Sequence, residues 1–203
     1  MNEHLTAADL IDFENEVVAR FKAKEILSPT HLYSNNEEEM IKIFKGIPKD
    51  SNICCSWRSH YQALLHGIPR EKVMAEILAG HSISLNFPEY NFFSSAIVTG
   101  QLSIGVGLAL ASKIKGDGRK TIIFLGDMTS ETGAAHECIK YSIAQKLPVK
   151  FIIEDNTFSV CTDTRETWGL DKLTYEGVNN EYVYYYKYKS KYPHAGVGER
   201  IQF

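Results

Sequence analysis

The chain has 203 residues, of which 44% are hydrophobic and 23% charged, and its formal net charge is −3. This length suits one domain with a sizeable buried core. The sequence has no block of basic residues, so the usual electrostatic basis for binding nucleic acid or an anionic membrane surface is absent. No apolar run approaches the roughly 18 residues of a membrane span, and the polar N-terminus is unlike a signal peptide. We therefore expect a cytoplasmic protein.

Two helices are expected in the first 50 residues, which we interpret as an N-terminal helical extension (1–50). Thr6 can cap a helix that runs to about residue 25, and Asn35-Asn36 precede a second helix with acidic residues in its first turn. Residues 51–203 are expected to form one α/β domain with a C-terminal arm.

Strands and helices alternate in this second part. Strands are expected over 53–56, 121–125, 149–154 and 182–188, and helices over 70–78, 101–115 and 130–145. Residues 81–99 show no clear period and predict a long ordered loop. Because the strands are continuous apolar runs separated by helices, the pattern predicts an α/β fold with a parallel sheet and helices on both faces.

The cysteines predict no metal site and no disulfide. Cys54, Cys55, Cys138 and Cys161 lack metal-ligand spacing, and adjacent cysteines such as the first two rarely pair. Free thiols are typical of a reducing compartment such as the cytosol.

Two Gly-Asp pairs compete as a candidate site. Gly116-Asp117-Gly118 lies between a helix and the amino end of a strand, so it predicts a helix cap and turn. Asp127 instead follows a buried strand, at the edge where open α/β sheets bind ligands, and Asn156 follows the next strand. Neighbouring parallel strands would bring these two side chains together. Their oxygens suit Mg²⁺ bridging a diphosphate, and a helix starting near Ser130 would offer N–H donors to phosphate.

The segment 126–156 resembles the thiamine-diphosphate motif, in which Gly-Asp-Gly precedes Asn-Asn by roughly thirty residues. Its filling is similar to the alpha subunit of the 2-oxo-acid dehydrogenases, their decarboxylating first component. Upstream, SWRSH resembles that family's Tyr-Arg-x-His segment, and AIVTGQLSIGVGLALA resembles its Gly-Ile-Val-Gly-x-Gln stretch. The resemblance covers roughly residues 50–170, more loosely to 200, and implies a thiamine-diphosphate-binding fold.

This resemblance implies that thiamine diphosphate and Mg²⁺ are bound. Asp127, the Asn156 side chain and the Phe158 carbonyl would hold the metal ion. The other implied cofactor-binding residues are Trp57, Arg58, Ile97, Val98, Gly126, Met128, Thr129 and Ser130.

Individual roles follow from the family pattern. Arg58 would pair with the diphosphate through its guanidinium fork, although an ordinary surface ion pair is the alternative. A carbonyl of the Ile97–Val98 segment would accept from the aminopyrimidine; without the resemblance, both residues would be assigned to the core. His60 and His194 are the candidate catalytic histidines.

The implied reaction is decarboxylation of a 2-oxo acid with transfer of the acyl unit. We find no second α/β domain in the sequence, so a beta-type subunit is expected to supply the pyrimidine-binding domain, in an α₂β₂ hetero-oligomer. The chain alone should be inactive.

Several departures from the family pattern keep alternatives open. Met128 replaces the second glycine of Gly-Asp-Gly, Ala96 and Thr99 stand where glycine is usual, and Leu85 lies near a position that often carries an acyl-transfer histidine. A split transketolase-like carboligase, which would join a two-carbon or acyl unit from a ketose or 2-oxo acid to an aldehyde, is the first alternative. A non-catalytic scaffold subunit is the second. A nicotinamide-binding domain is disfavoured, because no Gly-x-Gly-x-x-Gly follows a strand.

Met128 is expected to have a negative φ, because a side chain is then tolerated at this position.

Overall fold

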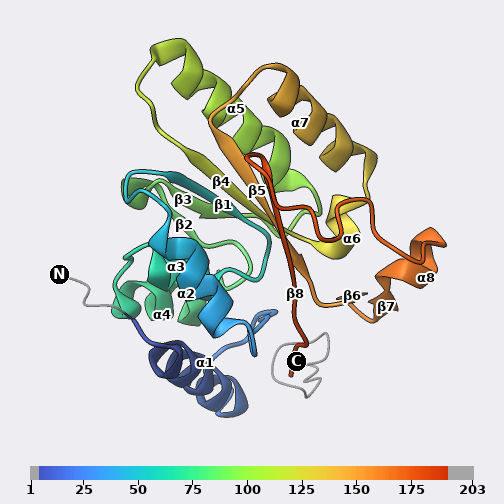
Figure 1. Ribbon diagram of the computed structural model, residues 1–203. Coiled ribbons are helices and arrows are strands. Elements are labelled where there is room, and N and C mark those ends of the chain that lie inside the picture. The colour runs from blue at the N-terminus through green and yellow to red at the C-terminus, as the bar shows by residue number, and fades with distance from the viewer. Residues whose placement is uncertain (1–4, 192–203) are drawn as a thin grey trace.

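The computed structural model describes residues 5–191 (Figure 1). Within this range a six-stranded sheet has the order β2-β3-β1-β4-β5-β8. Its strands are β1 (Asn52–Cys55), β2 (Asn86–Phe87), β3 (Phe92–Ser94), β4 (Thr121–Gly126), β5 (Val149–Asp155) and β8 (Val183–Lys187). All neighbouring pairs are parallel except the edge pair β2–β3. The predicted α/β fold with a mainly parallel sheet is therefore confirmed.

Helices cover both faces of this sheet, as predicted (Figure 1). One face packs against α1 (Ala7–Lys22), α2 (Glu37–Lys45), α3 (His60–Leu65) and α4 (Arg70–Leu78), and the other against α5 (Gly100–Lys115) and α7 (Gly133–Ala144). Successive strand residues point to opposite faces. Thus Ile53 belongs to the core under α1–α4, whereas its neighbour Cys54 belongs to the core under α5 and α7.

The first helix forms as its sequence predicts. The Thr6 hydroxyl accepts from the Asp9 N–H (3.3 Å) and the Asp9 carboxylate accepts from the Thr6 N–H (2.7 Å), which is a capping box. Buried Leu10, Phe13 and Val17 follow at helical spacing and pack into the same core as β1 and β4. The division of the chain into 1–50 and 51–203 stays a prediction.

Two glycines of α5 explain how this helix packs and ends. A Cβ on Gly105 would lie 2.6 Å from Cδ1 of Ile123, so only glycine lets the helix approach the sheet this closely. Gly116 ends the helix with a left-handed φ of 68°, and Asp117 accepts from the Arg119 N–H (3.0 Å) in the turn that follows. The prediction that Gly116-Asp117-Gly118 is a cap and turn is confirmed.

Short elements depart from the sequence-based expectations. The 81–99 segment is not wholly a loop, because it holds β2, the 3₁₀ helix η1 (Pro88–Tyr90) and β3. Strands of two or three residues are too short to show a period, so their pattern could not predict them. The polar stretch WRSHYQ leads into α3, which was also not predicted.

The helix expected over 130–145 is α7, which begins later, at Gly133, and a separate one-turn helix, α6 (Asp127–Ser130), precedes it. The break lies at Glu131 and Thr132. The Thr132 hydroxyl accepts from the Ala135 N–H (3.2 Å) and caps α7, while the Glu131 carboxylate accepts from the backbone N–H (2.9 Å) and hydroxyl (2.7 Å) of Thr174.

After β5 the chain forms a hairpin of β6 (Phe158–Ser159) and β7 (Thr162–Asp163), and then the one-turn helix α8 (Thr164–Trp168). None of the helices between residues 5 and 191 is both long and apolar enough to cross a bilayer. All four cysteines are free, as expected.

Candidate cofactor site

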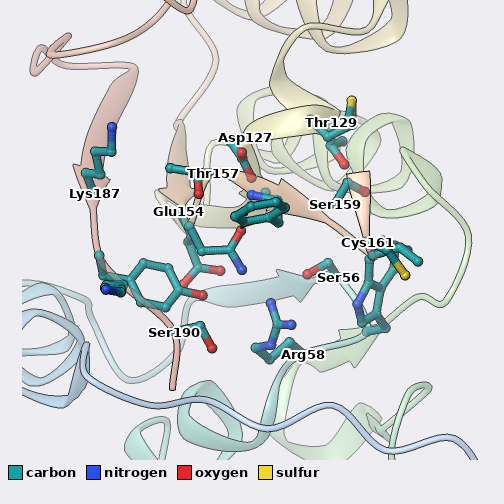
Figure 2. A pocket seen from close by; sticks show the side chains of 18 of the residues that line it. Ser56, Arg58, Asp127, Thr129, Glu154, Thr157, Ser159, Cys161, Lys187 and Ser190 are labelled. Atoms are coloured by element: carbon teal, nitrogen blue, oxygen red, sulfur yellow. Dashed lines mark hydrogen bonds between the residues drawn. The ribbon is translucent and has the colours of Figure 1, made fainter. Parts of the chain in front are cut away.

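A cavity of about 1020 Å³ opens at the carboxyl ends of the central strands (Figure 2). It is lined by Ser56–Arg58 after β1, by Gly126–Thr129 after β4, by Glu154 and 156–161 at the end of β5, and by Lys187–Lys191 at the end of β8. The chain leaves β1 toward α3 on one face of the sheet and leaves β4 toward α7 on the other face. This divergence opens a crevice between the two strand ends, which is where open α/β sheets bind ligands.

Asp127 lies on one side of this crevice and Arg58 on the opposite side (Figure 2). The Asp127 side chain is almost fully buried, and its Oδ2 atom has no hydrogen-bond partner among the described residues. Burial raises the pKa of this carboxyl to about 7 and the nearby Asp155 carboxylate adds to the rise, whereas the Thr164 side chain and the backbone N–H groups of Asp127 and Met128 lower it. A buried carboxylate oxygen without a donor needs a cation or a proton.

Asn156 lines the same cavity, and its Oδ1 atom accepts from the Phe158 N–H (3.2 Å). This bond closes a turn that places the Phe158 backbone on the cavity wall. Among residues 5–191, no cluster of three or more His, Cys, Asp or Glu side chains could hold a metal. The metal set predicted from the sequence is of another kind, with one carboxylate, one amide and one carbonyl.

Arg58 presents its guanidinium to the cavity from the end of β1. Its Cζ atom lies 5.8 Å from the ring centre of Tyr33, and its buried Nε atom has no hydrogen-bond partner in the described part of the chain. Such a guanidinium is not that of an ordinary surface ion pair. Trp57, beside it, also lines the cavity. An arginine that lines a cavity and has a donor without a partner is suited to bind an anion.

Met128 and Thr129 line the cavity from α6, whereas Ser130 does not. The Ser130 side chain is fully buried, and its hydroxyl donates to the Asp127 carbonyl (2.7 Å). The long helix α7 begins only at Gly133, and none of its residues is among those that line the cavity. The long helix therefore begins at Gly133 and not near Ser130 as expected, while the phosphate-binding role of Thr129 and Ser130 stays a prediction.

Met128, which replaces a glycine of the motif, adopts an ordinary backbone conformation. It lies within α6 and is not among the residues with positive φ, so the expected negative φ is confirmed. Its Sδ atom accepts a hydrogen bond from Nε1 of Trp168 (3.0 Å), which links α6 to α8. The residue that replaces glycine thus lines the cavity itself and contacts α8 behind it.

The structure does not bring His60 to the cavity. Its side chain is fully buried, with Nδ1 3.0 Å from a carboxylate oxygen of Glu14 and Nε2 3.0 Å from the hydroxyl of Ser82. This geometry joins α1, α3 and the segment after α4. His194, the other candidate histidine, lies outside the described residues.

Ile97 and Val98 precede α5 and do not line the cavity either. They are 71% and 46% exposed, so they are not core residues. The Ile97 carbonyl accepts from the Gly100 N–H (2.9 Å), and Thr99 between them has a left-handed φ of 69°. This strained turn holds two large apolar side chains in solvent.

Glu154 is a cavity residue that the sequence analysis did not assign. It accepts hydrogen bonds from the hydroxyls of Tyr33 (2.8 Å) and Tyr186 (2.6 Å), and burial raises the pKa of its carboxyl to about 7. The lysine-rich wall at 187–191 was also not assigned.

These observations define a class of protein: an α/β domain with a crevice suited to an anionic ligand at the switch point of a parallel sheet. A protein-family model described as "Dehydrogenase E1 component" matches residues 6–182. The chain belongs to this family. The resemblance to 2-oxo-acid dehydrogenase alpha subunits, drawn from the sequence motifs, is confirmed.

Curated relatives carry the same description. The pyruvate dehydrogenase E1 component subunit alpha of Porphyra purpurea is 26% identical over 166 residues, which cover 73% of this chain and 48% of the relative. The mitochondrial subunit of the same name from Dictyostelium discoideum is 31% identical, and the aligned region covers 76% of this chain and 43% of the relative. The subunit from Zymomonas mobilis is 30% identical, and the aligned region covers 72% of this chain and 45% of the relative. The chain thus spans less than half the length of these relatives.

Proposed function

We propose that the chain is the diphosphate-binding, alpha-type part of a thiamine-diphosphate-dependent enzyme that decarboxylates a 2-oxo acid and transfers the acyl unit. One observation carries this proposal: the buried Asp127 carboxylate, with an oxygen that lacks a donor, faces the unused donor of Arg58 across the crevice. A dication bound to a diphosphate supplies both missing partners. Family membership supports the same assignment.

The residues present fit this cofactor unit. Asp127, the Asn156 amide and the Phe158 carbonyl offer hard oxygen ligands to Mg²⁺. Arg58 and the hydroxyl of Thr129 offer donors to the diphosphate. When bound, thiamine diphosphate supplies a carbon nucleophile that can accept the electrons released with CO₂. The task of this chain is to bind and orient the diphosphate end.

Asp127 must lose its proton before a dication can bind. Burial holds the pKa of its carboxyl near 7, so a bound cation would have to displace a proton from this residue over much of the neutral range. A cation held there would also offset the cost of burying the charge.

We further propose a beta-type partner that completes the site, in an α₂β₂ assembly located in the cytoplasm. The exposed apolar residues near the cavity and before α5 support a partner at this edge: Ile97, Val98, Phe158, Val160 and Trp168 are all at least 43% exposed. Apolar side chains gathered at one edge are typical of an interaction surface. Free thiols at all four cysteines are consistent with the cytoplasm.

A split carboligase is the second candidate function, and the position of Leu85 supports it. This residue lies near the position expected to handle acyl transfer, yet it is fully buried and apolar. It therefore offers no group for passing an acyl unit to a carrier.

Assays of the assembled complex distinguish the candidates. A dehydrogenase component decarboxylates a 2-oxo acid, reduces an artificial electron acceptor and acylates lipoyl protein. A carboligase only joins the fragment to an aldehyde. A complex that binds the cofactor but converts neither class of substrate would support the alternative of a non-catalytic scaffold subunit. A monomer that is active by itself would contradict the proposal that the site is shared with a partner.

A further inference from the structure

Asp155 and Arg165 form an ion pair beside the cavity. Asp155 ends β5 and its side chain is fully buried, while Arg165 lies in α8 with 18% of its side chain exposed. Nη2 of Arg165 is 2.7 Å from Oδ2 of Asp155 and 2.7 Å from Oε2 of Glu176. Asp155 also stands at the first asparagine of the Asn-Asn pair in the thiamine-diphosphate motif. A carboxylate in place of that amide needs a physical explanation.

The Asp155 carboxylate organises the turn that follows it. Its Oδ1 atom accepts from the Thr157 N–H (2.8 Å), and the Tyr185 hydroxyl donates to Oδ2. Thr157 has a φ of 71°, a conformation that β-branched residues rarely adopt. The turn is therefore held by contacts from outside it. The same turn decides where the Asn156 amide and the Phe158 carbonyl lie.

Arg165 helps to hold together the two ends of the segment 155–165, which carries the proposed metal ligands Asn156 and Phe158. The β6–β7 hairpin returns the chain so that the Thr164 N–H donates to the Thr157 carbonyl (3.0 Å), and Arg165 is the next residue. Its second ion pair reaches Glu176, whose carboxylate also accepts from the Leu173 N–H (3.2 Å). The two ends of the segment 155–165 are thus fastened to each other and to the loop after α8.

The guanidinium also balances charge. Burial by itself would raise the pKa of Asp155, but the hydrogen bonds from Arg165, Tyr185 and the Thr157 N–H overcome it and lower the pKa. Without Arg165, an unpaired carboxylate would be buried close to Asp127, which is strongly unfavourable.

We propose that Arg165 is a positioning residue that acts through Asp155 to hold Asn156 and the Phe158 carbonyl in the geometry that binds the metal–diphosphate unit. The inference rests on the proposed function, because it assigns a task at the same site. Arg165 is not among the residues that line the cavity, so it acts without touching the cofactor.

Calorimetric titration of the full chain with Mg²⁺ and thiamine diphosphate, in the presence of the beta-type partner, tests this role. Arg165→Met, which removes the charge, should raise the Kd by about tenfold or more, as is usual when the support of a metal ligand is lost. Arg165→Lys keeps the charge but not the fork that contacts two carboxylates, so it should raise the Kd by about threefold. Arg20→Met is the matched control, because Arg20, on α1, also bridges two carboxylates, those of Glu16 and Glu25, both at 2.9 Å. It should leave the Kd unchanged.

A double variant tests whether Arg165 acts through Asp155. In Asp155→Asn/Arg165→Met, the amide oxygen can still accept from the Thr157 N–H, and no charge is left buried. The Kd should return to within about threefold of the unmodified chain, because effects of contacting residues are not additive. A double variant that binds as weakly as Arg165→Met would overturn the proposal. If Arg165→Met does not fold, the double variant decides alone: a Kd within about threefold of that of the unmodified chain supports the proposal, and a Kd raised by about tenfold or more overturns it.

Failure of this inference is distinguishable from failure of the proposed function. If the unmodified chain does not bind Mg²⁺ and thiamine diphosphate, with its partner present, the proposed function fails. If it binds and Arg165→Met binds equally well, only the role of Arg165 is overturned. Thermal unfolding of each variant without cofactor shows whether a change in Kd accompanies a change in folding; a purely structural role would lower the unfolding temperature and leave the Kd of the folded fraction unchanged.

Discussion

Glu154→Gln measures how strongly the cavity perturbs a buried acid. The carboxyl of Glu154 is 5% exposed and accepts hydrogen bonds from two tyrosine hydroxyls. Burial raises its pKa to about 7 from an ordinary value of 4.5, although those hydrogen bonds favour the charged form. The native chain therefore binds this proton more tightly than the unfolded chain does.

The sign and size of the effect follow from linkage. Because the folded-state pKa is raised, the stability contributed by the neutral carboxyl is complete below about pH 4.5 and is lost as the pH rises through 7. At about 1.4 kcal/mol for each pKa unit, the loss amounts to roughly 3 kcal/mol by pH 8. Glutamine keeps the shape and cannot ionise, so the variant should not show this loss.

Urea unfolding of the unmodified chain and of Glu154→Gln, each at pH 5 and pH 8, provides the assay. The difference in unfolding free energy between the two proteins should shift by about 3 kcal/mol in favour of the variant between these pH values. The difference is the proper readout, because burial raises the pKa of Asp127 as well and contributes its own slope. A difference that stays constant from pH 5 to pH 8 would refute the reasoning.

Two further predictions concern packing. His60→Gln should lower the unfolding free energy by about 1–3 kcal/mol, because it disrupts one of the two contacts of the buried Glu14 carboxylate and leaves only the Tyr33 N–H in place; a large loss of turnover with unchanged stability would instead indicate a catalytic histidine. Gly105→Ala should cost about 1–3 kcal/mol in urea unfolding, because its Cβ would meet Ile123. The control Gly107→Ala, in the same helix with open space around the added Cβ, should be neutral or stabilising by up to about 1 kcal/mol, and equal effects at the two glycines would contradict the described helix packing.

Much of the site could be predicted because its residues follow strands. Asp127 and Asn156 each stand at the carboxyl end of an apolar run, and the pairing of β4 with β5 was expected from their order in the chain. The placement of Arg58 after β1 followed from the motif. A local sequence pattern is enough to predict such residues as neighbours, because a parallel sheet brings the carboxyl ends of its strands to one edge.

The rest depended on contacts between residues far apart in the chain. His60 is buried because Glu14 and Ser82 meet it from other elements, and nothing in the segment SWRSH indicates this. The break between α6 and α7 coincides with the contact of Glu131 with Thr174, far along the chain. The pairing of Asp155 with Arg165 required the β6–β7 hairpin, whose strands of two residues are too short to be recognised.

The central claim is that Asp127, and not the neater Gly-Asp-Gly sequence, holds the metal that binds the diphosphate. Calorimetry with Mg²⁺ and thiamine diphosphate, in the presence of the beta-type partner, tests it with two matched variants. Asp127→Asn should raise the Kd by about 100-fold or more, because the charged ligand of the cation is lost. Asp117→Asn, in the turn after α5, should leave it unchanged. Equal binding by Asp127→Asn and the unmodified chain would contradict the account.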